Sequence, residues 1–301
     1  MTSEASANGR ATAYVRKRDG RTLAYEQQGG PHGVPVFVLH GTPGSRLNGL
    51  HPNPEKVRLA GLRLITYDRP GYGGSTRQPG RSVVDCVSDI ETIADELGLE
   101  QFAVTGGSGG APHSLAAAAR LPGRVRHAEC NVGPAPIDAE GLNYLDGMDP
   151  ENVKEIGWAL AGEETLAPEL EREAQQALDR LDADPATLLS EFDLAEADRA
   201  VLAREDVKQR LRVSFREAMA QGIGGWVDDD LAIVKPWGFD LAEIRVPVRV
   251  RYGVNDVLVP AAHGAWLASH IPGATVLVDE MSGHMSTPDQ GLERIRSFVS
   301  A

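Results

Sequence analysis

Short apolar runs rich in β-branched residues recur along this chain and alternate with stretches that have helical periodicity. Strands that alternate with helices form a mostly parallel sheet covered by helices on both faces. We therefore predict an α/β fold. Functional side chains in such sheets lie at the carboxyl ends of the strands, so the residues after each run are the candidates. The runs are 23–25, 36–39, 62–67, 102–104, 125–132, 248–252 and 275–278.

The sequence changes character over residues 136–236, where strand-like runs are absent and 163–181 and 195–221 have helical patterns. We predict a helical cap here, inserted between a first core segment, 1–135, and a second, 237–301. The insertion contains 24 acidic and 10 basic residues. Solvated helix faces explain this charge most simply. The functional alternative is a lid that prefers neutral or cationic substrates.

Composition excludes several classes of function. The chain has 301 residues, enough for one large domain or a core with an insertion, and a net charge of −13, which repels nucleic acid. The opening MTSEASANGR lacks the apolar stretch of a secretory signal, and no apolar run of about 18 residues occurs, so we expect a cytoplasmic protein without a membrane segment. Cys86 and Cys130 are expected to be small buried or half-buried side chains without a disulfide framework. Whether the protein is a monomer or a homodimer stays open.

Ser108 lies in the pattern Gly106-x-Ser108-x-Gly110, between an apolar run and an alanine-rich helical stretch. At a sharp turn from strand to helix, glycines allow the serine hydroxyl to stand clear of the sheet. A phosphate loop would need Lys-Ser/Thr after its last glycine, and a dinucleotide fingerprint has Pro112 where its third glycine belongs. Glu129 lies where the ribose-binding acid of that fingerprint would be. We nevertheless predict a nucleophile and no bound cofactor.

A serine becomes a good nucleophile when an imidazole takes its proton, and a carboxylate must orient that imidazole. His284 follows the last predicted strand by a short loop that contains glycine, and Asp256 ends another strand on a turn. Ser108, Asp256 and His284 are the predicted catalytic residues, in that chain order. Asp138, after the run 125–132, is the rival acid.

The segment HGTPGS, residues 40–45, directly follows an apolar run. A tight turn at the end of a strand can direct a backbone N–H into the site, and the residue after a nucleophilic serine can supply a second. We predict that Thr42 and Gly109 form this oxyanion hole. His40 is interpreted as an anchor for the loop.

The remaining polar candidates are assigned structural roles. Asp68 and Arg69 follow a buried strand, where such pairs generally hold loops together. His263 and His270 share a helix face without a nearby carboxylate, so no metal site is expected. His113 is expected to pack or to face solvent. The aromatic residues of the cap are interpreted as core rather than substrate walls: Trp158, Phe192, Phe215 and Trp226.

The motifs together resemble the α/β-hydrolase superfamily over essentially the whole chain. They are HGTPGS at 40–45, DRPGYGGS at 68–75, GGSGG at 106–110, GVND at 253–256 and SGHM at 282–285. The resemblance implies a mostly parallel eight-stranded core sheet, an inserted helical cap and a metal-free nucleophilic mechanism. Serine at position 108 is unlike the dehalogenase and epoxide-hydrolase branches, which attack with a carboxylate. The HGTPG loop resembles the HGGPG loop of proline iminopeptidases, with Thr42 in place of a glycine.

These observations predict a serine hydrolase that cleaves a small carboxylic ester or lactone through an acyl-enzyme on Ser108. Its partner is a small-molecule substrate. One alternative is an amide or peptide hydrolase whose acidic cap receives the ammonium group of the substrate. Two others are a small-molecule receptor and a biosynthetic catalyst without net hydrolysis, because fold membership leaves function open.

Overall fold

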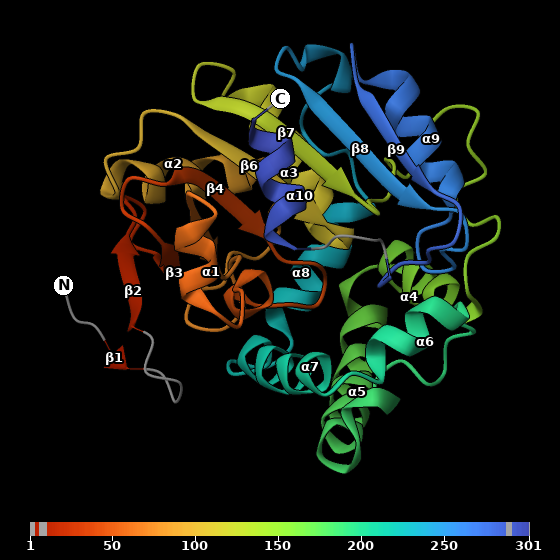
Figure 1. The fold of residues 1–301 in the computed structure, drawn as a ribbon. Coiled ribbons are helices and arrows are strands. Elements are labelled where there is room, and N and C mark those ends of the chain that lie inside the picture. Colours follow the sequence, from red (N-terminus) through yellow and green to blue (C-terminus); the bar gives the residue numbers. More distant parts are fainter. Residues whose placement is uncertain (1–3, 6–10, 287–290, 301) are drawn as a thin grey trace.

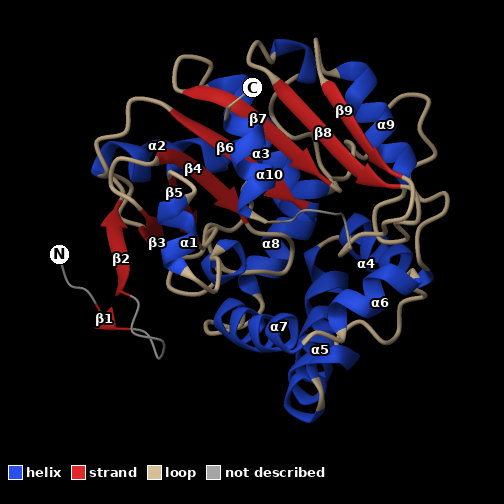
Figure 2. Cartoon of the chain, viewed as in Figure 1, coloured by secondary structure: helices blue, strands red, loops and turns tan. Residues whose placement is uncertain are grey.

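The computed structural model describes residues 4–5, 11–286 and 291–300. Among these residues it contains one sheet, with the strand order β1-β2-β3-β5-β4-β6-β7-β8-β9 (Figures 1 and 2). Strands β4 to β9 are parallel to one another, and β1, β2 and β3 pair in antiparallel fashion. The strands are β1 Glu4–Ala5, β2 Ala11–Arg16, β3 Thr22–Gly29, β4 Val34–Leu39, β5 Leu62–Tyr67, β6 Phe102–Gly107, β7 Val125–Asn131, β8 Val248–Gly253 and β9 Thr275–Asp279.

The predicted mostly parallel sheet is confirmed, and its eight strands correspond to β2–β9. The two-residue strand β1 is an addition that pairs only with β2. Strand β2 was not among the apolar runs because its sequence, ATAYVR, alternates small, polar and apolar residues. Such a pattern is typical of a half-buried antiparallel strand rather than of a central parallel strand.

Helices cover both faces of the sheet, and side-chain alternation along the strands determines which residues meet them. On β4, Phe37 and Leu39 belong to a hydrophobic cluster that includes residues of α2, α3 and α9, whereas Val36 belongs to a separate cluster with residues of α1 and α10. The small side chains of α3 allow this helix to lie close to β6 and β7. These helices are α1 Pro54–Leu59, α2 Cys86–Glu96, α3 Ala111–Arg120, α9 Ala261–His270 and α10 Leu292–Val299.

Five helices, here called the cap helices, lie between β7 and β8 in the chain and have a hydrophobic cluster of their own. Figure 1 shows them beyond the carboxyl ends of the parallel strands. They are α4 Pro150–Ala161, α5 Glu163–Ala183, α6 Glu196–Leu202, α7 Glu205–Ala218 and α8 Gly224–Ile233. The helical pattern predicted over 195–221 is two helices, α6 and α7. Among the described residues, no helix is both long and apolar enough to cross a bilayer.

Candidate active site

Ser108 occupies a sharp turn between β6 and α3. Its backbone φ is +53°, in the left-handed region that a residue with a side chain rarely adopts. A Cβ on Gly106 would lie 2.5 Å from the Gly110 carbonyl carbon, and a Cβ on Gly110 would lie 2.5 Å from the His40 carbonyl oxygen. Only glycine fits at these two positions. The steric reason predicted for the glycine pattern is therefore confirmed.

A second strained residue lies at the end of the neighbouring strand. Val132, directly after β7, has a φ of +43°, which is unusual for a β-branched side chain. Its N–H donates to the Arg251 carbonyl over 2.8 Å, which helps to hold this conformation. Among the described residues, Ser108 and Val132 are the non-glycine residues with positive φ. Such strain concentrates at functional sites.

The loop after β4 lies directly against this turn. A Cβ placed on Gly41 would be 3.4 Å from Ser108 Cβ and 3.9 Å from Ser108 Oγ. A Cβ on Gly109 would be 2.7 Å from Thr42 Cβ and 3.1 Å from the Thr42 backbone nitrogen. The structure thus brings together Ser108, Thr42 and Gly109, the nucleophile and the oxyanion donors expected from the sequence.

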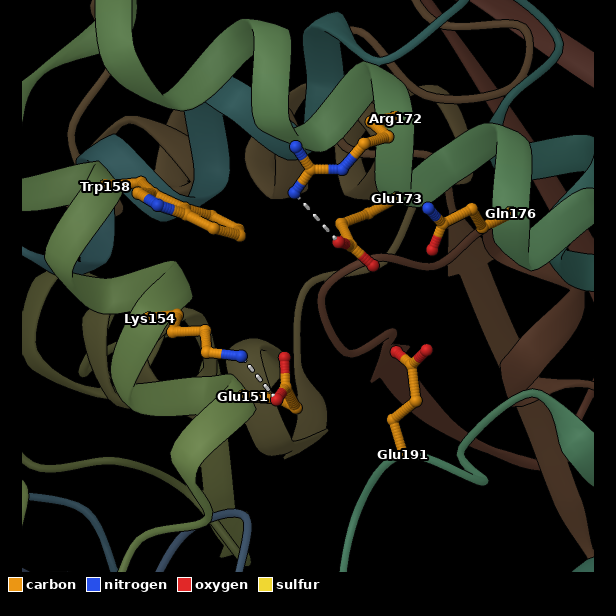
Figure 3. A pocket seen from close by; sticks show the side chains of 7 residues that line it. All are labelled: Glu151, Lys154, Trp158, Arg172, Glu173, Gln176 and Glu191. Carbon is orange, nitrogen blue, oxygen red and sulfur yellow. Dashed lines mark hydrogen bonds and ion pairs between the residues drawn. The ribbon is translucent and has the colours of Figure 1, made fainter.

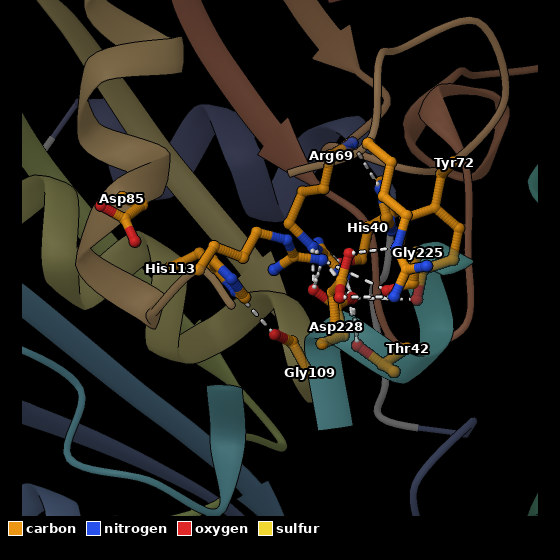
Figure 4. A network of polar contacts seen from close by, with 12 residues as sticks. His40, Thr42, Arg69, Tyr72, Asp85, Gly109, His113, Gly225 and Asp228 are labelled. Atoms are coloured by element: carbon orange, nitrogen blue, oxygen red, sulfur yellow. Dashed lines mark hydrogen bonds and ion pairs between the residues drawn. The ribbon is translucent and has the colours of Figure 1, made fainter. Parts of the chain in front are cut away.

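His40 anchors this loop, as expected (Figure 4). Its Nδ1 donates to the Gly41 carbonyl over 2.7 Å, and its Nε2 accepts the Arg69 backbone N–H at 3.2 Å. A carbonyl only accepts and an N–H only donates, so the ring is the neutral tautomer with its proton on Nδ1. Burial, reinforced by the Arg69 charge, lowers the pKa of His40 well below its usual value.

Asp229 of the cap helix α8 supports the same loop from the other side. Its carboxylate lies 2.6 Å from Arg69 Nη2 and 2.7 Å from Arg81 Nη2. It also accepts hydrogen bonds from Tyr72 Oη at 3.0 Å and Thr42 Oγ1 at 2.8 Å. Burial by itself would raise the pKa of Asp229, but the two guanidinium groups hold it well below its usual value. The proposed oxyanion loop is therefore fixed by an ion cluster that includes a cap residue.

His284 and Asp256 form the second part of the site. Asp256 Oδ2 lies 2.8 Å from His284 Nδ1, and Oδ1 accepts the backbone N–H groups of Leu258 and Val259, both at 2.9 Å. Because a carboxylate accepts, the proton of the neutral ring is on Nδ1 and the lone pair is on Nε2. Burial lowers the pKa of His284, but Asp256 outweighs it and the net pKa is raised. Asp138, the rival acid, is exposed.

Two buried cap carboxylates that the sequence analysis did not single out reach these loops. Asp229 binds the loop after β4, and Asp198 of α6 accepts the backbone N–H of His284 at 2.8 Å. Their only sequence signal was membership of an acid-rich insertion. A pattern of this kind does not reveal which acids are buried.

Two other histidines, His113 and His263, form structural hydrogen bonds. His113 Nδ1 donates to the Gly109 carbonyl over 2.9 Å, and burial lowers the pKa of His113 to about 3. His263 bridges the Ala135 N–H and the Tyr144 carbonyl, at 3.1 and 2.9 Å. Within the described ranges, no group of three or more histidine, cysteine or acidic side chains is placed to hold a metal ion.

Three further polar or reactive residues singled out in the sequence are also buried. Glu129, in the position of a ribose-binding acid, forms ion pairs with Arg294 and, at 2.5 Å, with Arg249. Its carboxylate is thus already partnered within the protein. Cys86 and Cys130 are free, buried thiols, as predicted.

The aromatic residues of the cap pack mainly in its own core. Phe215 and Trp226 form an edge-to-face pair, with centroids 6.4 Å apart, inside the hydrophobic cluster of the cap helices.

Trp158 is half-buried and borders a hollow between α4 and α5 (Figure 3). None of the predicted catalytic or oxyanion residues lines this hollow. Its lining residues are Glu151, Lys154, Trp158, Arg172, Glu173, Gln176 and Glu191.

Residues 34–289 match the family model described as the alpha/beta hydrolase fold. A proline iminopeptidase of Neisseria meningitidis serogroup B is 26% identical over 297 residues, which cover 91% of this chain and 90% of that protein. A proline iminopeptidase of Xanthomonas citri is 40% identical over 110 residues, which are 34% of this chain and only 33% of that relative. Among solved structures, an enol-lactonase from Burkholderia xenovorans LB400 is 20% identical with a TM-score of 0.67, covering 96% of this chain and 100% of that one.

Proposed function

This chain belongs to the alpha/beta hydrolase fold family, and on that premise we propose that it is a serine hydrolase that cleaves a small carboxylic ester or lactone. The observation that carries the proposal is the strained turn that presents Ser108, flanked by Thr42 and Gly109. The contact between Asp256 and His284 supports the same reading. Each of these groups follows a strand of the parallel part of the sheet, where sites of this fold class form.

In the proposed mechanism, Ser108 Oγ attacks the carbonyl carbon of the substrate while His284 Nε2 takes the hydroxyl proton. The Asp256 carboxylate balances the charge of the imidazolium and keeps the ring oriented. The backbone N–H groups of Thr42 and Gly109 stabilise the oxyanion. His284 then gives its proton to the leaving alkoxide. Water attacks the acyl-enzyme by the same route and releases the acid. The segment 136–236 is proposed to be the cap over this site.

Replacing Ser108 with alanine tests the proposal directly. Wild-type protein should react with a fluorophosphonate probe at Ser108 and hydrolyse aryl esters. The Ser108→Ala variant should lose the label and on the order of 10⁴-fold or more in turnover. Ser114→Ala is the control. It also removes a hydroxyl near the turn, but that hydroxyl is buried and is already engaged with the Ala111 and Glu129 carbonyls. Retained turnover in Ser108→Ala would rule the mechanism out, and a single-turnover burst with retained product would favour a receptor.

A second candidate function is supported by a pair of acids in the cap, Asp230, which is buried, and Glu155, which is half-buried. Burial raises the pKa of Asp230 well above its usual value, and the neighbouring Glu155 adds to this; burial also raises the pKa of Glu155. Asp230 Oδ2 is buried without a hydrogen-bond partner. A cationic group could satisfy both carboxyls. An amide hydrolase for substrates with a terminal ammonium would use such a pair, and relatives of this chain are named proline iminopeptidases.

A substrate panel separates the two functions. We propose comparing aryl esters, aminoacyl arylamides and the N-acetylated forms of the same arylamides, which lack the ammonium group. Faster turnover of plain aryl esters supports the ester or lactone hydrolase. Preference for free-amine arylamides, lost on acetylation and in Asp230→Asn, would instead support the amide hydrolase.

A further inference from the structure

Asp198 is a completely buried acid on the cap helix α6, although α6 is otherwise exposed over much of its surface. It accepts hydrogen bonds from three consecutive backbone N–H groups of the loop after β9. Oδ2 accepts from His284 at 2.8 Å, and Oδ1 accepts from Met285 at 3.0 Å and Ser286 at 2.8 Å. Successive N–H groups that converge on one anion form a nest, a strong and directional anion site.

The loop is shaped around this carboxylate. A Cβ on Gly283 would lie 2.7 Å from Asp198 Cγ, so only glycine allows the close approach. The Gly283 N–H donates to Ser286 Oγ at 2.9 Å, and Ser282 Oγ donates to the Ser286 carbonyl at 3.0 Å. The Asn255 N–H also donates to the Ser282 carbonyl, at 2.9 Å, and connects the loop to the turn that carries Asp256. Residues 282–286 thus enclose an anion that the cap supplies.

This contact joins the cap to the core at His284, the proposed general base. His284 lies in the loop after β9, but the carboxylate that accepts its backbone N–H lies 86 positions earlier in the chain, on α6. If α6 moves away from the sheet, the three N–H groups lose their acceptor and the loop loses the interaction that fixes its shape. The Asp198 charge also adds to the effect of Asp256, against burial, in raising the pKa of His284.

We propose that Asp198 is a positioning residue through which docking of the cap assembles the general base, so that His284 is aligned only when α6 is seated. The inference rests on the role of His284 in the proposed function. It makes the cap part of the catalytic apparatus through a carboxylate that binds the backbone of the loop carrying His284. Turnover would then be suppressed whenever the cap is displaced.

The test compares Asp198→Asn with Glu196→Gln, which removes one charge from an exposed position of the same helix. Hydrogen exchange, read by mass spectrometry on a peptide covering 282–286, reports the nest whether or not the protein is a hydrolase. In Asp198→Asn the amides of residues 284–286 should exchange about tenfold faster or more, because the new amide group can accept from only some of them. Glu196→Gln should leave their exchange unchanged.

Kinetics on an aryl ester then separate positioning from a purely structural role. In Asp198→Asn, kcat should fall about tenfold or more with little change in KM, because the base is misaligned but the substrate contacts remain. The acidic limb of the kcat/KM profile should move to lower pH, because loss of the Asp198 charge lowers the pKa of His284. Gly283→Ala keeps the charge but displaces the carboxylate, so it should lower kcat without that shift.

Unchanged exchange in Asp198→Asn would overturn the inference, as would an equal loss of kcat in Glu196→Gln. Faster exchange with unaltered kcat and pH profile would also overturn it, because the loop would then be ordered for folding alone. Failure of the proposed function gives a different result: Ser108→Ala keeps its turnover while the exchange measurement still reports on the nest.

Discussion

The two parts of the candidate site contain buried histidines with opposite pKa shifts. His40 and His113, behind the Ser108 turn, have their pKa lowered by burial and then by Arg69. His284 is also buried, but the charges of Asp256 and Asp198 raise its pKa. Burial lowers the pKa in all three cases, so the neighbouring charge decides the outcome. Where Arg69 outweighs the nearby Asp229, histidine is a fixed hydrogen-bonding group, and where only carboxylates act alongside burial, it can act as a base.

The two parts also differ in what gives them their shape. Around Ser108, the turn itself is shaped by sterics, because glycines lie at positions where no side chain fits. Around His284, the backbone is held by carboxylates that accept N–H groups. Substitutions at the Ser108 turn should therefore act through geometry, whereas substitutions near His284 should act through charge and proton affinity.

The largest effect is expected where a carboxylate orients the base. In Asp256→Asn the amide can donate to His284 Nδ1 and stabilise the wrong tautomer, so kcat on an aryl ester should fall on the order of 10⁴-fold. Asp138→Asn is the matched control, because this acid follows a neighbouring strand but is exposed. A larger loss in Asp138→Asn would reverse the assignment of the acid.

A smaller loss should follow from steric disruption of the Ser108 turn. Alanine at Gly109 would place Cβ 2.7 Å from Thr42 Cβ and push apart the two proposed oxyanion donors. We expect kcat to fall about 10²- to 10³-fold, the usual effect of losing one such donor. Gly107→Ala is the control in the same turn, because its Cβ would meet no atom within 4 Å and its φ is −114°. Equal losses of kcat in both variants would show that the close contact between Gly109 and Thr42 is not what turnover depends on.

The smallest predicted effect concerns stability against pH. His113 has a pKa of about 3 in the folded protein and about 6.5 when unfolded, so the unfolded state binds the extra proton between these values. Its contribution to stability is lost as pH falls below about 6.5, by about 1.4 kcal/mol per pH unit. In His113→Asn, the new amide can still donate to the Gly109 carbonyl. The free energy of unfolding, measured with urea, should fall less steeply between about pH 6 and about pH 5 in this variant than in the wild-type protein. An unchanged slope would contradict the assignment of a buried neutral ring.

Local sequence was sufficient to predict features that depend on a strand and the turn after it. The serine turn, the loop at 40–45, Asp256 and His284 each follow an apolar run, and each lies at the carboxyl end of a strand. The pattern over 195–221 misled, because helical periodicity continues through the break between α6 and α7. Ala203 and Arg204 form that break without glycine or proline, so the local sequence contains no stop signal.

By itself, the sequence was sufficient to predict the fold class, the strained turn at Ser108 and the candidate acid and base, Asp256 and His284, because these depend on short-range sterics and hydrophobic patterning. Only the tertiary structure decided which cap acids matter. Asp229 and Asp230 are neighbours in one acidic run, yet Asp229 has a lowered pKa beside two guanidinium groups and Asp230 a raised pKa beside Glu155. Asp229 meets Arg69 across 160 positions of sequence, and Asp198 meets His284 across 86. Acids that are alike in sequence differ in proton affinity once packing selects the charges beside them.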